Sequence, residues 1–327
     1  MIDGVITGTT TDGVSYVVPV FNKRRFLRQV IAGLAAQRGA FAREFIFIDD
    51  GSTDGSRDEL EQHAPVLGDV RILSQANAGP SVTTNRGLRA ARFPLVKLVD
   101  GDDVLLPDAT AQLRVALERH PEAALAYGQS ATYADAEDAL ARIGPDYFMG
   151  ARPAEPPPER IEQALKPLLR ECYLGPSNCL IRRDLALAVG GSDERVFVQD
   201  YSLLLRLAAR AAFVALDAPV VLHPAAPQDR LNDGGPQLLH DTNLTVAHFL
   251  AEHDVPPDLA AMATRRAMTR AWLWAKRREG ATPLSRWYWL RLASYLPLPA
   301  LRASLLEASC GAFTLSRDVR RSMPSAP

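Results

Sequence analysis

Short apolar runs and helical patterns alternate four times near the start of the chain, and this alternation constrains the fold more than any other feature. The runs at 14–20, 44–48, 70–73 and 94–99 have the length and branched side chains of buried strands. Helical patterns follow them at 26–35, 56–63, 81–91 and 106–117. This order predicts an α/β fold with a doubly wound, mostly parallel sheet flanked by helices.

Acidic clusters follow two of these strands. Asp49 and Asp50 come after the run 44–48, and Asp100, Asp102 and Asp103 come after the run 94–99. The carboxyl ends of parallel strands share one edge of the sheet, where open α/β folds bind ligands. Crowded carboxylates repel one another unless a cation compensates, and hard oxygen ligands favour Mg²⁺ or Mn²⁺ bridging to a phosphorylated substrate. One Asp-Gly pair would indicate only a turn, but two clusters together predict a binding edge.

The composition is that of a soluble, enzyme-sized protein. The chain has 327 residues, of which 47% are hydrophobic, so it can bury a large core. Residues 1–13 lack the apolar core of a signal peptide, and no uncharged apolar stretch reaches the roughly 18 residues of a membrane span. Cys172, Cys179 and Cys310 show neither metal-ligand nor disulfide spacing. We therefore expect a cytoplasmic protein.

The C-terminal region is basic although the whole chain carries a net charge of −1. Residues 259–327 hold 12 Lys and Arg against 3 acidic residues, and the basic residues interleave with Trp272, Trp274, Trp287 and Trp289. Cationic helices with aromatic side chains can lie peripherally on an anionic membrane surface. Helices packed on the body of the protein, with a solvated basic face, explain the same pattern, so both interpretations stay open. Nucleic-acid binding is not expected, because the chain as a whole is not basic.

Five strings of sequence, in one order and spacing, resemble family 2 glycosyltransferases with the GT-A fold. They are VSYVVPVFN at 14–22, IDDGSTDGS at 48–56, NAGPSVTTNRGLRAA at 77–91, VDGDDVLLP at 99–107 and GGSDERVFVQDYSLLLRLA at 190–208. The resemblance covers about residues 14–223. It implies a catalytic domain at 1–235, with a nucleotide-sugar half at about 14–105 and an acceptor half at about 106–235. A basic helical C-terminal appendage at 236–327 follows.

The resemblance implies inverting transfer of a sugar from a nucleotide donor, with a UDP sugar as the expected donor, to an acceptor hydroxyl. We expect a glycan or lipid-linked acceptor in cell-envelope polysaccharide or glycolipid synthesis. The implied donor-binding residues are Pro19, Val20, Phe21, Asn22, Asp50, Asn77, Gly79, Asn85, Asp100 and Asp102. The implied metal is Mn²⁺ or Mg²⁺ held by Asp102, Asp103 and His223. Such an ion stabilises the charge on a departing diphosphate.

Asp200 matches the family's catalytic base, which takes a proton from the acceptor hydroxyl. Its alternative role is to cap the helix expected from Tyr201. Gln199 stands where the family has an acidic residue, and Thr84 stands where it has an arginine near the donor phosphates. Arg86 comes two positions after Thr84. His223 is alternatively a structural histidine after a strand.

Two other functions fit parts of the pattern. An inactive sugar-nucleotide-binding protein would keep Asp50 and Asp102, so only turnover separates it from an enzyme. A receiver-like signalling domain also gathers acidic residues after strands. It places its acidic pair after the first strand, however, whereas Asp49 and Asp50 follow the second. A dehydrogenase is disfavoured because no Gly-x-Gly-x-x-Gly turn follows the first strand.

Overall fold

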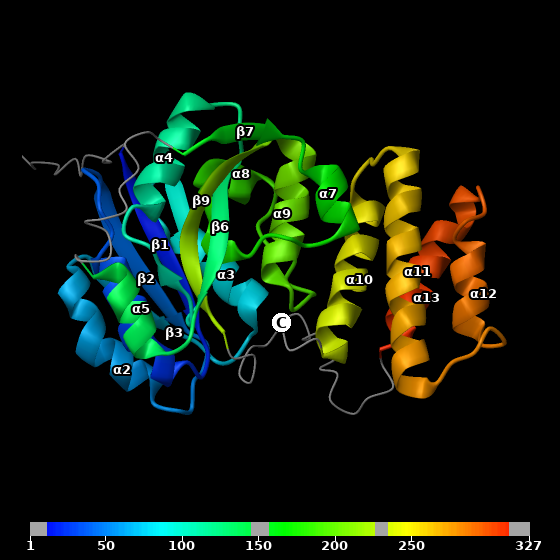
Figure 1. Ribbon diagram of the computed structural model, residues 1–327, viewed down its shortest axis with the longest axis horizontal. Helices are drawn as coiled ribbons and strands as arrows, with labels where there is room; N and C mark the ends of the chain where they lie inside the picture. Colours follow the sequence, from blue (N-terminus) through cyan, green and yellow to red (C-terminus); the bar gives the residue numbers. More distant parts are fainter. Residues whose placement is uncertain (1–11, 145–156, 226–234, 314–327) are drawn as a thin grey trace, which may run out of the picture.

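The computed structural model describes residues 12–144, 157–225 and 235–313. Within these residues nine strands form one sheet, and helices pack around it (Figure 1). The strand order is β3-β2-β1-β4-β8-β6-β9-β5, and β7 also pairs with β9. Helices cover both faces of the sheet, and a second group of helices stands at one side (Figure 1).

The N-terminal half of the sheet is fully parallel. Its strands are β1 (Gly13–Val20), β2 (Ala42–Asp49), β3 (Val70–Ser74) and β4 (Leu95–Leu98), with β1 paired to both β2 and β4. The connections contain η1 (Arg24–Phe26), α1 (Leu27–Ala35), α2 (Ser56–His63), η2 (Ala64–Leu67) and α3 (Pro80–Ala90). Central β1 is buried on both faces, which explains its mostly apolar sequence.

The second half of the sheet is mixed. Strand β8 (Cys179–Arg182) runs antiparallel between β4 and β6 (Leu125–Tyr133), and β6 is parallel to β9 (Phe213–Pro224). Short strands β5 (Val104–Leu105) and β7 (Glu159–Glu162) are antiparallel to β9. Strands β1 to β4, β6 and β9 therefore all point the same way, which confirms a mostly parallel sheet.

Helices and short turns connect these strands. They are α4 (Ala109–Arg119), α5 (Ala136–Ile143), α7 (Leu165–Arg170), η3 (Pro176–Asn178), α8 (Arg183–Ala188) and α9 (Gln199–Arg210). The fourth helix was expected to start at Leu106. It starts at Ala109 instead, because Val104 and Leu105 pair with β9 and keep the chain extended.

The C-terminal helices pack against the α/β body. They are α10 (Pro236–Glu252), α11 (Pro257–Glu279), α12 (Arg286–Ala293), η5 (Pro299–Leu301) and α13 (Arg302–Gly311). Phe249 of α10, Ala263 and Ala267 of α11 and Leu306 of α13 belong to the same buried cluster as Ile48 of β2. One continuous core thus joins α10, α11 and α13 to the sheet. Helix α10 lies beside α9, and α11 packs on α7 (Figure 1).

One sequence expectation adjoins a segment outside the described residues. The expected domain boundary at 235 follows residues 226–234. No helix within the described ranges is long and apolar enough to cross a membrane.

Candidate functional site

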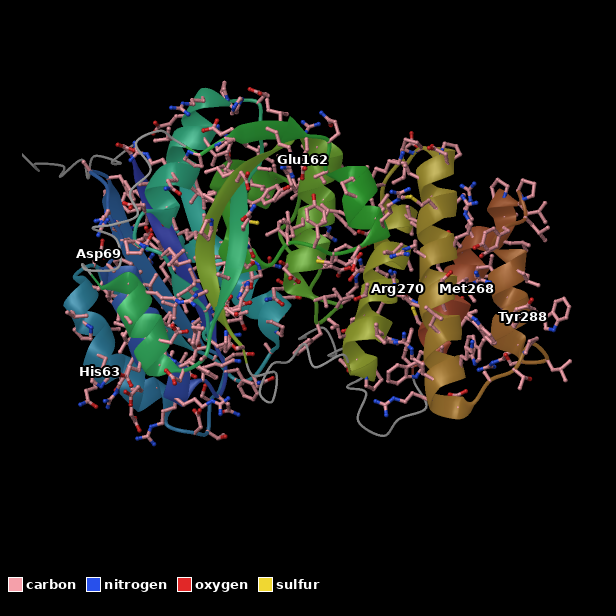
Figure 2. The ribbon with its side chains drawn as sticks, viewed as in Figure 1. His63, Asp69, Glu162, Met268, Arg270 and Tyr288 are labelled. Carbon is pink, nitrogen blue, oxygen red and sulfur yellow. The ribbon has the colours of Figure 1, made fainter. Side chains whose placement is uncertain are left out.

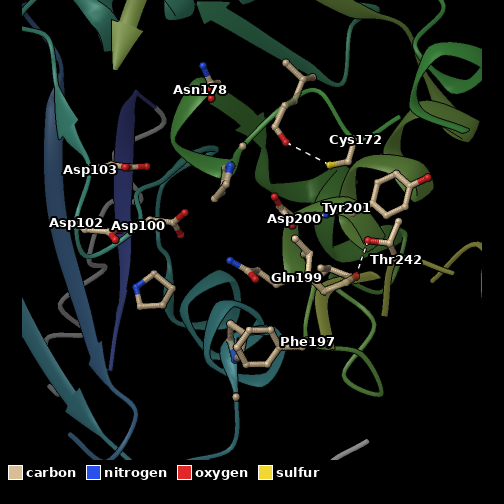
Figure 3. Close-up of a pocket in the computed structure, with 18 of the residues that line it drawn as sticks. Asp100, Asp102, Asp103, Cys172, Asn178, Phe197, Gln199, Asp200, Tyr201 and Thr242 are labelled. Atoms are coloured by element: carbon tan, nitrogen blue, oxygen red, sulfur yellow. Dashed lines mark hydrogen bonds between the residues drawn. The ribbon is translucent and has the colours of Figure 1, made fainter. Parts of the chain in front are cut away.

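A cleft of about 680 Å³ opens at the carboxyl ends of the parallel strands. Most of the residues implicated by the sequence line it: Pro19, Val20, Phe21, Asp50, Asn77, Gly79, Asp100, Asp102, Asp103, Asp200 and His223. Figure 3 shows Asp100, Asp102 and Asp103 on one side and Asp200, Tyr201 and Thr242 on the other. Segments that lie more than 200 residues apart in the sequence therefore meet in one place.

Asp50 follows β2, and its carboxylate orders the loop that follows β3. Its carboxylate accepts hydrogen bonds from Gln75 Nε2 (2.8 Å) and from the backbone N–H groups of Ala78 (2.8 Å) and Gly79 (2.9 Å). An ionised carboxylate has about four acceptor positions, so about one remains for a ligand. Gly51 next to it has φ +75°, and a Cβ there would lie 2.9 Å from the Asn77 nitrogen. This close approach requires glycine.

The second acidic cluster forms a tight turn after β4, in which the Asp103 N–H donates to the Asp100 carbonyl oxygen (3.0 Å). Asp102 Oδ2 lies 2.6 Å from Lys23 Nζ, and Asp103 Oδ1 lies 2.6 Å from His223 Nδ1. Burial raises the pKa of Asp100 well above its usual range, and the negative charges of Asp103, Asp102 and Asp200 add to the effect. The cluster is thus a buried concentration of negative charge that a cation would relieve.

Within residues 12–144, 157–225 and 235–313, no three His, Cys, Asp or Glu side chains gather into a complete metal-binding group. Asp103 and His223 nevertheless lie together at the cleft, and Asp102 is next to them in the turn. A site that shares its metal with substrate phosphates needs only one or two carboxylates from the protein. The residues present therefore fit a metal that the donor helps to hold, and not a metal held by the protein alone.

Buried Lys97 of β4 helps to fix the turn that contains Asp100. Its ammonium group donates to the carbonyl oxygens of Ser177 and Cys179 (3.1 Å to the latter), while Ser177 Oγ accepts the Asp100 N–H (2.9 Å). Burial lowers the pKa of Lys97 to about 8. The β4–η3 contact thereby fixes the position of the Asp100 backbone.

Asp200 lies in the first turn of α9, which begins at Gln199, two residues earlier than expected. The N-cap position belongs to Val198, so Asp200 is not the N-cap residue. Its Oδ1 accepts the N–H of Tyr201 (2.8 Å). Burial raises the pKa of Asp200 to about 6 and outweighs the lowering effect of the backbone hydrogen bonds. The Asp200 and Asp100 carboxylates project toward one another across the cleft (Figure 3).

Asn22 and Asn85 do not line the cleft. Asn22 adopts φ +53° and accepts the Thr53 N–H (2.8 Å), so it ties the loop after β1 to the loop after β2. Asn85 is buried in α3 and bonds to both the N–H and the carbonyl oxygen of Ser192 (2.8 Å each). It holds the turn that precedes α9.

The sequence did not reveal four basic residues of the lining: Lys23, Arg170, Arg266 and Arg270. Arg86 does not replace the family's phosphate-side arginine, because it donates to the Ser74 carbonyl oxygen and Gln75 Oε1 outside the cleft. Arg266 and Arg270 are four residues apart on one helix, a spacing that places them on the same face. The spacing alone could not show that this face meets the cleft.

Comparison with solved structures confirms the fold class. TarS of S. aureus in complex with UDP superposes with a TM-score of 0.59 at 16% identity, covering 92% of this chain and 89% of that chain. The mannosyltransferase PcManGT from Pyrobaculum calidifontis, in complex with GDP-Man and Mn2+, gives 0.54 at 16% identity and covers 93% and 87%. The chain has the GT-A fold of nucleotide-sugar transferases.

The sequence profile described as Glycosyl transferase family 2 matches residues 15–189, more than half of the chain. The chain therefore belongs to glycosyl transferase family 2. It is 39% identical over 98 residues to the uncharacterized glycosyltransferase YibD of Escherichia coli, which is 30% of this chain and 28% of that protein. It is 37% identical over 90 residues to the uncharacterized glycosyltransferase EpsJ of Bacillus subtilis, 28% of this chain and 26% of that protein. Both alignments span less than a third of the relative's length.

Proposed function

We propose that this protein is an inverting, divalent-metal-dependent glycosyltransferase that moves a sugar from a UDP sugar to an acceptor hydroxyl. The expected setting is cell-envelope polysaccharide or glycolipid synthesis on the cytoplasmic side of a membrane. The observation that carries the proposal is the meeting of Asp50, the Asp100–Asp103 turn and Asp200 in one cleft of a family 2 protein.

The donor side of the cleft suits a nucleoside diphosphate. The remaining acceptor position of Asp50 can receive the ring N–H of uracil, and Pro19, Val20 and Phe21 line the cleft beside it. Asp102, Asp103 and His223 would hold Mn²⁺ or Mg²⁺ together with the diphosphate, and the ion would stabilise the charge on the departing group. TarS with UDP-GlcNAc and PcManGT with GDP-Man and Mn2+ are precedents on this fold.

Asp200 is suited to act as the base. It lines the cleft across from the acidic turn, so an acceptor between them can present its hydroxyl to both the base and the donor sugar. With a pKa of about 6, its carboxylate is mostly ionised at neutral pH and remains basic enough to take a proton.

A thermal-shift screen of UDP, GDP and dTDP sugars, each with and without Mn²⁺, tests the donor. A ligand that binds the folded state raises the melting temperature. We expect the largest increase with a UDP sugar and Mn²⁺, and release of UDP when an acceptor is added. Binding without turnover over a broad acceptor panel would favour the inactive binding protein instead.

We also propose that the outer face of the C-terminal region contacts a membrane surface. Trp272 and Trp287 are buried between the helices, which uses part of the aromatic pattern for packing. Trp289 is 59% exposed and Leu296 is 54% exposed, and Tyr295 and Leu298 beside Leu296 are also exposed. Exposed apolar side chains among arginines suit an anionic lipid surface.

Vesicle flotation tests this contact. Full-length protein should float with anionic vesicles, and the double variant Trp289→Glu, Leu296→Glu should stay in solution. Val66→Glu is the matched control, because Val66 is 73% exposed on the opposite, sheet-containing part of the molecule. Equal flotation of the wild type and the double variant would refute the assignment.

A further inference from the structure

The wall of the cleft beyond Asp200 carries three arginines that come from separate parts of the chain. Arg170 ends α7, and Arg266 and Arg270 lie on α11. Arg266 Nε donates to the Arg170 carbonyl oxygen (3.1 Å), which brings the two elements together. Figure 2 labels Arg270 on the side of α11 that is turned toward the α/β body.

Arg270 has an unsatisfied donor at this wall. Its Nε donates to Asn243 Oδ1 of α10 (2.7 Å), which fixes the guanidinium, while its Nη2 is buried and has no hydrogen-bond partner in the described part of the molecule. A buried charged donor without a partner is costly, and native proteins rarely keep one without a function. Burial lowers the pKa of Arg270, yet a guanidinium remains charged at physiological pH.

The positive charge at this wall is only partly offset by the protein. None of Arg170, Arg266 and Arg270 forms an ion pair with a side chain in the described ranges. Glu171 lines the same wall and offsets part of the positive charge. Guanidinium groups match the geometry of phosphate oxygens and bind them by paired hydrogen bonds.

The position of the arginines separates them from the donor site. The acidic turn lies on one side of Asp200, and Tyr201 lies on the other (Figure 3). Burial raises the pKa of Tyr201, and the positive charges of Arg270 and Arg266 are close enough to it to act in the lowering direction. If Asp200 is the base, a group bound at the arginines belongs to the acceptor. Leu238 and Leu239 of α10 line the cleft as well, so an alkyl chain beside the phosphate would find apolar surface.

We propose that Arg170, Arg266 and Arg270 form an acceptor subsite for a phosphate ester, so that the acceptor carries its phosphate on the far side of Asp200 from the donor diphosphate. This inference rests on the proposed function, which assigns one side of the cleft to the donor and the other to the acceptor. The phosphate ester can be part of a soluble polyol phosphate or the head group of a lipid.

The test measures two affinities for each variant by calorimetry. The first is that of UDP with Mn²⁺, which reports on the donor site alone. The second is that of a phosphate ester added to protein saturated with UDP and Mn²⁺, using glycerol 3-phosphate as a soluble probe and dodecyl phosphate in non-ionic micelles as a lipid-like probe. A stronger affinity for dodecyl phosphate would identify a lipid acceptor, and equal affinities a soluble one.

Arg270→Gln should weaken phosphate-ester binding about tenfold or more, because charge-assisted hydrogen bonds are lost, and should leave UDP affinity within about twofold. Arg266→Gln should act in the same direction and removes an exposed side chain, so it tests the subsite even if Arg270→Gln destabilises the α10–α11 contact. Arg265→Gln is the matched control, because Arg265 does not line the cleft and lies over the Tyr295 ring instead.

Three results would overturn the subsite. The wild type could bind UDP but neither phosphate ester; Arg266→Gln could bind the esters as tightly as Arg265→Gln; or the arginine variants could weaken UDP while sparing the esters, which would assign the arginines to the donor. Failure of UDP to bind the wild type would contradict the donor proposal separately. Ester binding measured without UDP would then still show whether the arginines form an anion site.

Discussion

The two walls of the cleft differ in charge and in the way their side chains are held. On the strand side, Asp100, Asp102 and Asp103 sit on a four-residue turn fixed by β4 and by the Ser177 hydroxyl. On the helical side, Arg266 and Arg270 project from a long helix that depends on packing against α10 and α13. The acidic wall lies within the segment matched by the family profile, and α11 lies beyond it. The family profile thus includes the acidic wall but ends before Asp200 and before the helix that bears Arg266 and Arg270.

The largest effect is expected for Asp200→Asn, which changes the residue between the two walls and tests whether they act together in transfer. We expect transfer to fall by about 10²–10⁴-fold, the usual contribution of a general base, because the amide cannot take the acceptor proton. UDP affinity should stay within about twofold. Rate measurements with the donor found by the screen, together with calorimetry, test both statements; an unchanged rate would remove Asp200 from the mechanism.

His223→Ala tests the acidic wall. The Asp103–His223 contact of 2.6 Å orients the carboxylate whether or not the imidazole also binds the metal. Losing such a partner lowers metal affinity by about 10–100-fold, so the Mn²⁺ concentration that gives half-maximal UDP binding should rise accordingly. His63→Ala on distant α2 is the control (Figure 2). An Mn²⁺ dependence equal to that of the control would argue against a metal at this position.

The pH profile tests whether Asp200 acts in its ionised form. Burial raises its pKa to about 6, so the carboxylate becomes protonated as the pH falls through that value. Transfer should therefore be lost at low pH, with kcat/KM falling about tenfold for each unit below pH 6. UDP affinity measured at each pH separates this effect from donor binding. A flat profile between pH 5 and 7 would contradict the assignment.

Asn85→Ala should have the smallest effect on ligand affinity of the four changes. The sequence assigned Asn85 to the donor, whereas the structure shows it bonded to Ser192 and Glu194 in the turn before α9. Removing it leaves the buried Ser192 N–H without its partner, so we expect a loss of about 2–3 kcal/mol of folding free energy and little change in UDP affinity. Chemical denaturation and calorimetry measure the two. A large loss of UDP affinity in a stable variant would restore the donor role.

Much of the strand side could be predicted because its information is local. Each acidic cluster directly follows the strand that positions it, so the parallel order of β1, β2 and β4 suffices to bring Asp50 and Asp100 to one edge. The approximate position of α9 was also predictable, since its apolar positions recur at helical spacing.

The rest depends on contacts between distant segments. The reversed strand β8 enters between β4 and β6, and no local pattern at 179–182 specifies that pairing. The ion pair of Lys23 with Asp102 joins two loops that are 79 positions apart. The sequence indicated that α11 carries a basic surface. That this surface faces the cleft depends on tertiary packing through residues such as Phe249 and Ala267.

The single core shared by β2, α10, α11 and α13 has a practical consequence for anyone who would shorten the protein. A fragment cut at the end of the segment that matches the family profile would lack Asp200 and His223, and one cut after α9 would still lack the helix that bears Arg266 and Arg270. Either fragment would also lose Phe249, Ala263, Ala267 and Leu306, and with them part of the buried core. A fragment that keeps both walls of the cleft and this core intact therefore has to extend through α13.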